Sequence, residues 1–203
     1  MLFRSVGRIT LVDHDTVSLT NLQRQIAHDM GSLDRPKVES AATRMAALNP
    51  GVQVRTSARK ADAELLDEEV PRVDVVIDCT DNFATRHLVN AACVRHARPL
   101  VSGAAIGFDG QISVYDSRSG ELPCYACLFP PESGFEDVAC STMGVFAPLV
   151  GIIGSTQAAE ALKLLAGVGE PLAGRLLMLD GRRMQWSEIA MQRDPECPVC
   201  SAG

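Results

Sequence analysis

The sequence predicts an α/β protein built on a doubly wound, mostly parallel sheet. Short apolar stretches of strand length alternate with longer amphipathic stretches of helix length. One short stretch, VDVVID at residues 73–78, is apolar enough to be a strand buried on both faces. The stretches at residues 8–13 and 73–78 both end in aspartate, at the sheet edge where such folds bind ligands.

The first half of the chain contains three predicted strands and three predicted helices. Residues 36–48 form an amphipathic helix, because apolar side chains recur every three or four positions, Pro36 suits the first turn and Asn49-Pro50-Gly51 ends it. The other predicted elements are strands over residues 8–13, 52–56 and 73–78, a short helix over 63–69 and a longer helix over 82–97.

The second half is predicted to hold the most apolar helix, over residues 145–166. Its second half contains Gln157, Glu160 and Lys163, so the uncharged part is too short to span a bilayer and a buried helix is expected. Short strands are expected over residues 99–102 and 110–115. Two final strands, over 175–180 and 184–189, are predicted to be antiparallel and to precede a cysteine-bearing tail.

Composition is that of a soluble, single-domain protein spanning residues 1–203. Apolar residues make up 46% and aromatic residues 4%, so the core must be built from Ala, Val, Leu and Ile. The net charge of −6 disfavours nucleic acid or an anionic membrane as the partner. No signal peptide is visible, so a cytoplasmic location is expected.

Four of the seven cysteines form two C-x-x-C pairs, Cys124/Cys127 and Cys197/Cys200, which predict a structural Zn²⁺ site. The long intervening loop costs only ~1 kcal/mol more than that of a zinc ribbon. Zinc binding in small peptides contributes roughly 10–16 kcal/mol, so loop length does not exclude the site. The alternatives are two unrelated knuckles or one redox pair, but a redox pair normally begins a helix and neither pair is expected to.

Cys140 belongs to no pair and lies in FEDVACSTMGVFAP, a polar approach to the long helix. Such a position would expose a thiol and lower its pKa through the helix N-terminus. The alternative is an inert free cysteine, which these local features favour.

Polar residues also gather after the first strand. Arg24 and Lys37 follow Asp13, and Lys37 lies in a first helical turn, where the dipole disfavours a cation by a few tenths of a kcal/mol. A bound phosphate would reverse that cost. The alternatives are a solvated lysine, a surface arginine and, for Asp81, a routine helix N-cap.

Taken together, these motifs resemble a known family. VDHDTVSLTNLQRQ, RPKVESA, DCTDN, LVSGAAIGFDGQISVY, PCYAC, FAPLVGIIGSTQAAEALKLLAG and the final CPVC are similar, in order and spacing, to the MoeB/ThiF-type adenylyltransferases of the ubiquitin-activating-enzyme superfamily. The resemblance implies a Rossmann-like domain that uses ATP and Mg²⁺ to adenylate the C-terminal glycine of a ubiquitin-like sulfur carrier ending in Gly-Gly. The acyl-adenylate then becomes a thiocarboxylate for molybdopterin or thiamin synthesis.

The resemblance also implies roles for individual residues. Asp13 would hold the ribose, Arg24 and Lys37 the triphosphate, and Asp81 the Mg²⁺ ion. Cys140 lies where some relatives place a cysteine that takes the activated acyl group or sulfur. The implied catalytic residues are Arg24, Lys37, Asp81 and Cys140; the implied nucleotide-binding residues are Asp13, Thr20, Asn21, Arg24, Lys37, Asp81 and Asn82.

The family has a further N-terminal helical arm, first strand and glycine-rich turn, for which the residues before Gly7 leave no room. We therefore expect a truncated chain, impaired in ATP binding, with Met1–Ser5 as an artefactual head. The alternative function is a non-catalytic, zinc-stabilised scaffold that binds a carrier or homodimerises. An NAD-dependent dehydrogenase would explain Asp13 but not Arg24, Lys37 or DCTDN. The resemblance further implies a homodimer and a separate sulfur-donor protein.

Overall fold

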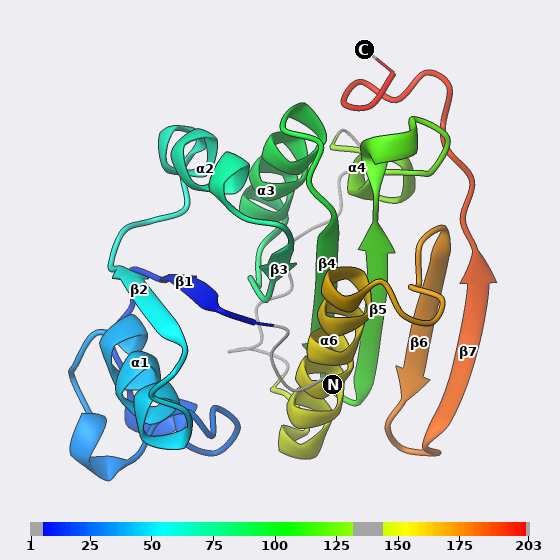
Figure 1. Cartoon of the computed structure of the whole chain (residues 1–203). Coiled ribbons are helices and arrows are strands. Elements are labelled where there is room, and N and C mark those ends of the chain that lie inside the picture. The colour runs from blue at the N-terminus through cyan, green and yellow to red at the C-terminus, as the bar shows by residue number, and fades with distance from the viewer. Residues whose placement is uncertain (1–5, 132–143, 202–203) are drawn as a thin grey trace. The chain divides into compact units, whose positions relative to one another are not determined.

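A computed structural model describes residues 6–131 and 144–201 of this chain (Figure 1). The chain divides into two compact units, Met1–Ala61 and Asp62–Gly203. Both units combine helices with strands, as the alternating pattern predicts.

The first unit is a parallel strand pair with one covering helix. Strand β1 (Arg8–Val12) pairs with β2 (Gln53–Ser57) from Arg8 opposite Gln53 to Val12 opposite Ser57. Helix α1 (Lys37–Leu48) connects them and packs against both. Two short 3₁₀ turns, Leu19–Asn21 and Met30–Ser32, lie in the segment that leads from β1 to α1.

The second unit contains a five-stranded sheet in the order β3-β4-β5-β6-β7. Strands β3 and β4 are parallel, and the three remaining pairs are antiparallel. The strands are β3 (Val76–Asp78), β4 (Leu100–Ile106), β5 (Asp109–Tyr115), β6 (Arg175–Asp180) and β7 (Gln185–Ala190). The antiparallel pairing of β6 with β7 is confirmed.

The prediction of a mostly parallel sheet is wrong for this unit. Two residues, Gly107 and Phe108, join β4 to β5, whereas a parallel connection needs a crossover of about a dozen residues or more. Gly107 has φ 55°, a conformation that glycine adopts without strain and that suits a two-residue hairpin turn. The chain therefore turns back directly and antiparallel pairing begins at β4.

Strand β3 also differs from the prediction of a strand buried on both faces. Of the residues 73–78, only Val76–Asp78 form the strand, and a 3₁₀ turn, Val70–Arg72, precedes them. The strand lies at one edge of the five-stranded sheet, and Ile77 is 46% exposed.

Helices cover the sheet of the second unit. The segment from β3 to β4 contains α3 (Phe83–Arg95), and α3 packs against α2 (Ala63–Glu69) and against the short α4 (Tyr125–Leu128). Another 3₁₀ turn, Ser117–Ser119, follows β5. Helix α6 (Ala147–Ala166) lies across β4 and β5 (Figure 1). One core cluster includes Ala161 of α6 together with Val101, Ile112, Val114 and Leu172.

Helix α6 is long and apolar enough, judged by length and composition, to cross a membrane. One of its faces packs against the sheet through Leu149 and Ile153, which contact Leu179 of β6. Gln157 and Glu160 are also buried, and both are hydrogen-bonded to the backbone of the same unit. These are the contacts of a helix that covers a sheet.

Candidate functional site

A cluster of charged side chains lies where β1 ends and α1 begins. The Lys37 Nζ atom lies 2.7 Å from Asp15 Oδ2 and 3.8 Å from Asp13 Oδ2. Asp13 Oδ1 in turn accepts a hydrogen bond from the Asp15 backbone N–H at 2.8 Å. The Lys37 side chain is 15% exposed. The alternative of a solvated lysine is therefore wrong.

Backbone pairing brings these residues together. The segment after β1 runs beside the segment before α1: the Val17 N–H donates to the Arg35 carbonyl, and the Lys37 N–H donates to the Asp15 carbonyl. Val17 is completely buried and fixes this segment. The Lys37 ammonium donates to the Asp15 carboxylate and so lowers the pKa of Asp15 below its usual value. Sequence analysis missed Asp15, although its spacing of two from Asp13 was a usable signal.

Three other predicted residues of this unit lie at the first 3₁₀ turn. Asn21 is buried, and its Oδ1 atom accepts the Ser18 N–H at 3.0 Å. The Thr20 and Ser18 hydroxyls lie 2.8 Å apart. The Arg24 guanidinium donates to the Thr20 carbonyl at 3.0 Å. Asn21 therefore shapes the turn that presents Thr20 and Arg24.

In the second unit, the predicted Asp81 and Asn82 follow β3. Asn82 is the N-cap of α3, since its Oδ1 atom accepts the Thr85 N–H at 2.8 Å. The alternative of Asp81 as the N-cap is therefore wrong. The exposed Asp81 carboxylate accepts a hydrogen bond from the Asn82 amide nitrogen at 3.5 Å. An exposed carboxylate oxygen is the kind of ligand that Mg²⁺ prefers.

Beneath Asp81 lies a buried polar network that sequence analysis missed. The Arg86 guanidinium forms an ion pair with Asp78 Oδ2 at 3.1 Å and donates to Ser102 Oγ at 3.0 Å. The Ser102 hydroxyl donates to the same Asp78 oxygen at 3.0 Å. A usable signal was the position of Arg86 on the buried face of α3, which it shares with Val89, Asn90 and Cys93.

Helix α6 completes this network. The Gln157 amide donates to the Asp78 carbonyl at 2.7 Å, and its oxygen lies 3.5 Å from Cys79 Sγ. Gly103 makes room for Gln157, since a Cβ atom at position 103 would lie 2.4 Å from the Gln157 amide carbon. The Arg86 and Gln157 side chains thus connect β3 to β4 and β3 to α6.

The four cysteines of the two C-x-x-C pairs come together in the second unit, and their sulfur atoms all lie within 4.8 Å of one another. The Sγ–Sγ distances are 3.7 Å for Cys124–Cys197, 3.4 Å for Cys127–Cys200 and 3.9 Å for Cys124–Cys127. A tetrahedral ion with Zn–S bonds near 2.3 Å separates its sulfurs by about 3.8 Å. The residues therefore fit Zn²⁺, and these distances are far too long for disulfide bonds.

The expectation that neither C-x-x-C pair begins a helix is wrong, because Cys124 is the N-cap of the short helix α4. The four thiols still fit Zn²⁺ better than a redox pair, because a redox pair does not explain two further thiols at metal-ligand distance. Cys140, the remaining predicted site residue, lies outside the described residues.

Asn90 links α3 to this cysteine cluster. The side chain is 1% exposed, its amide lies 3.6 Å from Cys124 Sγ, and its Oδ1 atom accepts the Tyr125 N–H at 2.9 Å. The Arg193 guanidinium donates a hydrogen bond to the Cys200 carbonyl at 2.7 Å, which fixes the backbone of the Cys197/Cys200 pair. Burial raises the pKa of the Cys127 thiol to about 11, so a cation is needed to keep it as a thiolate at neutral pH.

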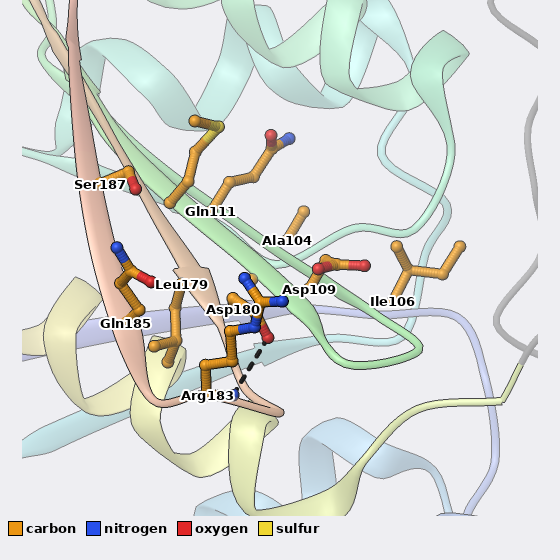
Figure 2. Close-up of a pocket in the computed structure, with 11 residues that line it drawn as sticks. Ala104, Ile106, Asp109, Gln111, Leu179, Asp180, Arg183, Gln185 and Ser187 are labelled. Atoms are coloured by element: carbon orange, nitrogen blue, oxygen red, sulfur yellow. Dashed lines mark hydrogen bonds and ion pairs between the residues drawn. The ribbon is translucent and has the colours of Figure 1, made fainter.

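A pocket of about 530 Å³ opens on the β4–β7 part of the sheet (Figure 2). The residues predicted as site residues are not among those that line it. Asp180 Oδ1 accepts the Arg183 backbone N–H at 3.2 Å at its rim. Two rows of residues in register across the strands form its floor: Ala104, Gln111, Met178 and Ser187, then Ile106, Asp109, Asp180 and Gln185.

Known proteins match this chain over nearly its whole length. The ThiF family profile matches residues 2–199. The chain is 46% identical to the molybdopterin-synthase adenylyltransferase of Escherichia coli K12, covering 96% of this chain and 78% of that protein. It is 45% identical to the sulfur carrier protein ThiS adenylyltransferase of the same organism, covering 96% and 76%.

Solved structures show the same fold. The crystal structure of E. coli MccB with ATP matches with a TM-score of 0.80 at 23% identity. The match covers 96% of this chain and 59% of MccB, so the chain spans less than two thirds of that protein. The likeness supports a Rossmann-like α/β fold with a mixed sheet.

Proposed function

Because this chain belongs to the ThiF family, we propose that it adenylates the C-terminal glycine carboxylate of a small ubiquitin-like sulfur-carrier protein with ATP. The carrier carboxylate attacks the α-phosphorus of ATP, a new C–O–P linkage forms, and the bond to pyrophosphate breaks. Two relatives named as molybdopterin-synthase and ThiS adenylyltransferases support this reaction. Molybdopterin and thiamin synthesis are therefore the proposed pathways.

The observation that carries the proposal is the pairing of Lys37 with Asp13 and Asp15. This arrangement holds a cation and a carboxylate where a strand ends and a helix begins, the usual place for nucleotides in such folds. We propose that Asp13 binds the ribose hydroxyls, that Lys37 and Arg24 bind the triphosphate, and that Thr20, Asn21 and Asn82 complete the nucleotide contacts. The two cations would stabilise the negative charge that develops on the phosphates.

We propose that Asp81 holds Mg²⁺. The ion, when bound, neutralises phosphate oxygens and the departing pyrophosphate. The exposed carboxylate of Asp81 supports this role, because Asn82 rather than Asp81 serves as the cap of α3.

The remaining proposals concern the cysteines and the partners. The Cys124, Cys127, Cys197 and Cys200 thiolates would fill all four positions around Zn²⁺, leaving none for substrate, so the ion is structural. Cys140 is proposed to accept the activated acyl group or sulfur. We further propose a cytoplasmic homodimer that receives sulfur from a separate donor protein.

Carrier-dependent exchange of labelled pyrophosphate into ATP tests this function. We expect exchange with a carrier ending in Gly-Gly and none when those two residues are removed. Lys37→Ala should lower the rate by about 10²–10³-fold, the usual effect of removing one strong electrostatic contact. The exposed Lys60→Ala is the matched control and should leave the rate unchanged.

The E. coli molybdopterin-synthase adenylyltransferase serves as the positive control. If it supports exchange and this chain does not, the proposed reaction is wrong for this chain. Carrier binding by calorimetry without exchange would instead identify the zinc-stabilised scaffold.

A further inference from the structure

We propose that Arg86 is a positioning residue that fixes the loop carrying Asp81 and so prepares it for a divalent cation. The proposal rests on the proposed function in one respect, the assignment of Asp81 as the Mg²⁺ ligand. Arg86 itself is buried in α3, with 8% of its surface exposed, and does not touch the cation or the nucleotide in this assignment.

The Arg86 guanidinium donates to acceptors on three segments. Besides Asp78 and Ser102, it donates to the Gly103 carbonyl at 3.0 Å and to the Thr80 carbonyl. Thr80 directly precedes Asp81, while Ser102 and Gly103 belong to β4. One side chain therefore ties the loop after β3 to the neighbouring strand.

The other bonds of the loop hold it on both sides of Asp81. Asp78 Oδ1 accepts the Thr80 N–H at 2.9 Å and the Thr80 hydroxyl at 2.7 Å. Gln157 fixes the Asp78 carbonyl, and Asn82 caps α3. The polar groups before and after Asp81 are engaged inside the unit, whereas the Asp81 carboxylate is exposed. Hydrogen bonds that fix the neighbouring backbone in this way are how proteins hold a metal-binding side chain in position before the metal arrives.

Stability alone is a weak explanation for this arginine. Removing a guanidinium and a carboxylate from water costs roughly as much as their attraction returns, so buried ion pairs often add little to folding. Two of the Arg86 acceptors are backbone carbonyls, which favours a positioning role. Lysine keeps the charge but not the planar fork, so Arg86→Lys separates the two properties.

The test compares Arg86→Lys with Arg95→Lys, a control on the same helix whose side chain is 55% exposed. Binding of Mn²⁺·ATP is measured by calorimetry, and amide hydrogen exchange is followed by mass spectrometry. We expect Arg86→Lys to weaken Mn²⁺·ATP binding at least 10-fold and to speed exchange in residues 79–82 at least 10-fold. Exchange in β5 and β6 should stay as in the wild type, and Arg95→Lys should change neither quantity.

Unchanged Mn²⁺·ATP binding in Arg86→Lys overturns the proposal. Faster exchange spread equally over β5 and β6 also overturns it, because that pattern marks a general loss of stability. Asp81→Asn tests the assignment of Asp81 as the Mg²⁺ ligand separately from the role of Arg86. If Asp81→Asn leaves Mn²⁺·ATP binding unchanged while Arg86→Lys weakens binding, Asp81 is not the Mg²⁺ ligand. The proposed role of Arg86 then fails as well. If Asp81→Asn and Arg86→Lys weaken binding alike, both stand, whether or not pyrophosphate exchange is observed.

Discussion

Individual polar side chains hold the backbone around the proposed nucleotide-binding residues. Asn21 shapes a turn, Asn82 caps a helix and Lys37 bridges two carboxylates, all while being candidates for ligand contact. Substitution at these positions would therefore change the local structure as well as the proposed nucleotide binding. A variant that tests local structure without changing the proposed nucleotide contacts has to be made at a neighbouring residue.

His28 offers such a test, because its effect depends on pH. Its Nδ1 atom lies 2.9 Å from the Ser40 hydroxyl. Burial lowers the pKa of His28 below its usual 6.5; the nearby Lys37 adds to this, while Asp13 and Asp29 oppose it. The unfolded chain then takes up a proton at higher pH than the folded chain, so stability is lost as the pH falls below 6.5.

We expect His28→Asn, which keeps a polar atom near Ser40, to flatten the fall of the unfolding midpoint between pH 7 and pH 5. Thermal unfolding at several pH values measures this slope. Gln53→Asn changes an exposed side chain of the same unit that carries no titrating group; it is the control and should keep the wild-type slope. Parallel curves for wild type and His28→Asn would contradict the expectation.

Asn90 is expected to tune the zinc site. Asn90→Ala removes the amide beside Cys124 and leaves the Tyr125 N–H without its acceptor, so Zn²⁺ affinity should fall about 10–100-fold. Competition with a coloured chelator measures the affinity. Asn49→Ala is the same substitution at a residue of the first unit, and it should leave the Zn²⁺ affinity unchanged. An equal affinity for both variants would show that Asn90 does not support the metal ligands.

The proposed site residues that the sequence indicates are those whose signal is local. C-x-x-C spacing predicts a zinc pair, and Asp13 and Lys37 stand at a strand end and a helix start. Gln157 escaped because its acceptor Asp78 lies 79 residues away in the chain. Arg86 has Asp78 only 8 residues away, but its acceptors on β4 lie 16 and 17 residues away. A buried polar network becomes visible only when the strands that hold its partners are placed side by side.

At the scale of elements, hydrophobic periodicity located most helices and strands. The helix expected over residues 36–48 is observed as Lys37–Leu48, and the strand expected over 175–180 as Arg175–Asp180. Strand direction was harder to predict, because it depends on whether a connection is a turn or a crossover. Between β4 and β5, the tight turn at Gly107 makes the two strands antiparallel. The pattern of apolar residues carries no information about strand direction.

The close contact between β4 and α6 makes Gly103 sensitive to a single methyl group. Gly103→Ala would press on the Gln157 amide and disturb its bond to Asp78, so we expect a loss of about 1–3 kcal/mol in unfolding free energy. Gly151→Ala is the matched change within α6, where an added Cβ meets nothing within 4 Å. It should stabilise the protein by up to about 1 kcal/mol.

Urea unfolding measures both variants, with the dependence on urea concentration expected to stay constant. A Gly103→Ala protein as stable as Gly151→Ala would show that Gln157 moves aside without cost.

At the scale of the whole molecule, the four-cysteine cluster joins the segment after β7 to the segment after β5. Cys124 and Cys197 are fully buried in one cluster with Ala126, packed against Val94 of α3. The C-terminal segment is therefore attached to the second unit through the cysteine cluster and a few apolar contacts.

Removing the proposed Zn²⁺ ion should release this C-terminal segment. After chelation, we expect trypsin to cleave after Arg193 at least 10-fold faster, because the Cys200 carbonyl no longer holds that side chain in place. Mass spectrometry of the fragments follows the reaction. Cleavage after Arg44 in α1 provides an internal control and should keep its rate. Unchanged cleavage after Arg193 would mean that apolar packing alone retains the segment.

The spacing of the cysteine pairs also has a consequence for synthesis in the cell. Cys124 and Cys197 are 73 positions apart, and a ribosome that adds roughly 5–20 residues per second needs about 4–15 s to make that stretch. During this interval Cys124 and Cys127 are neighbouring thiols whose metal partners have not been made. Oxidation in those seconds would join them to each other, so the redox state of the compartment would decide whether the newly made chain can bind the proposed Zn²⁺ ion.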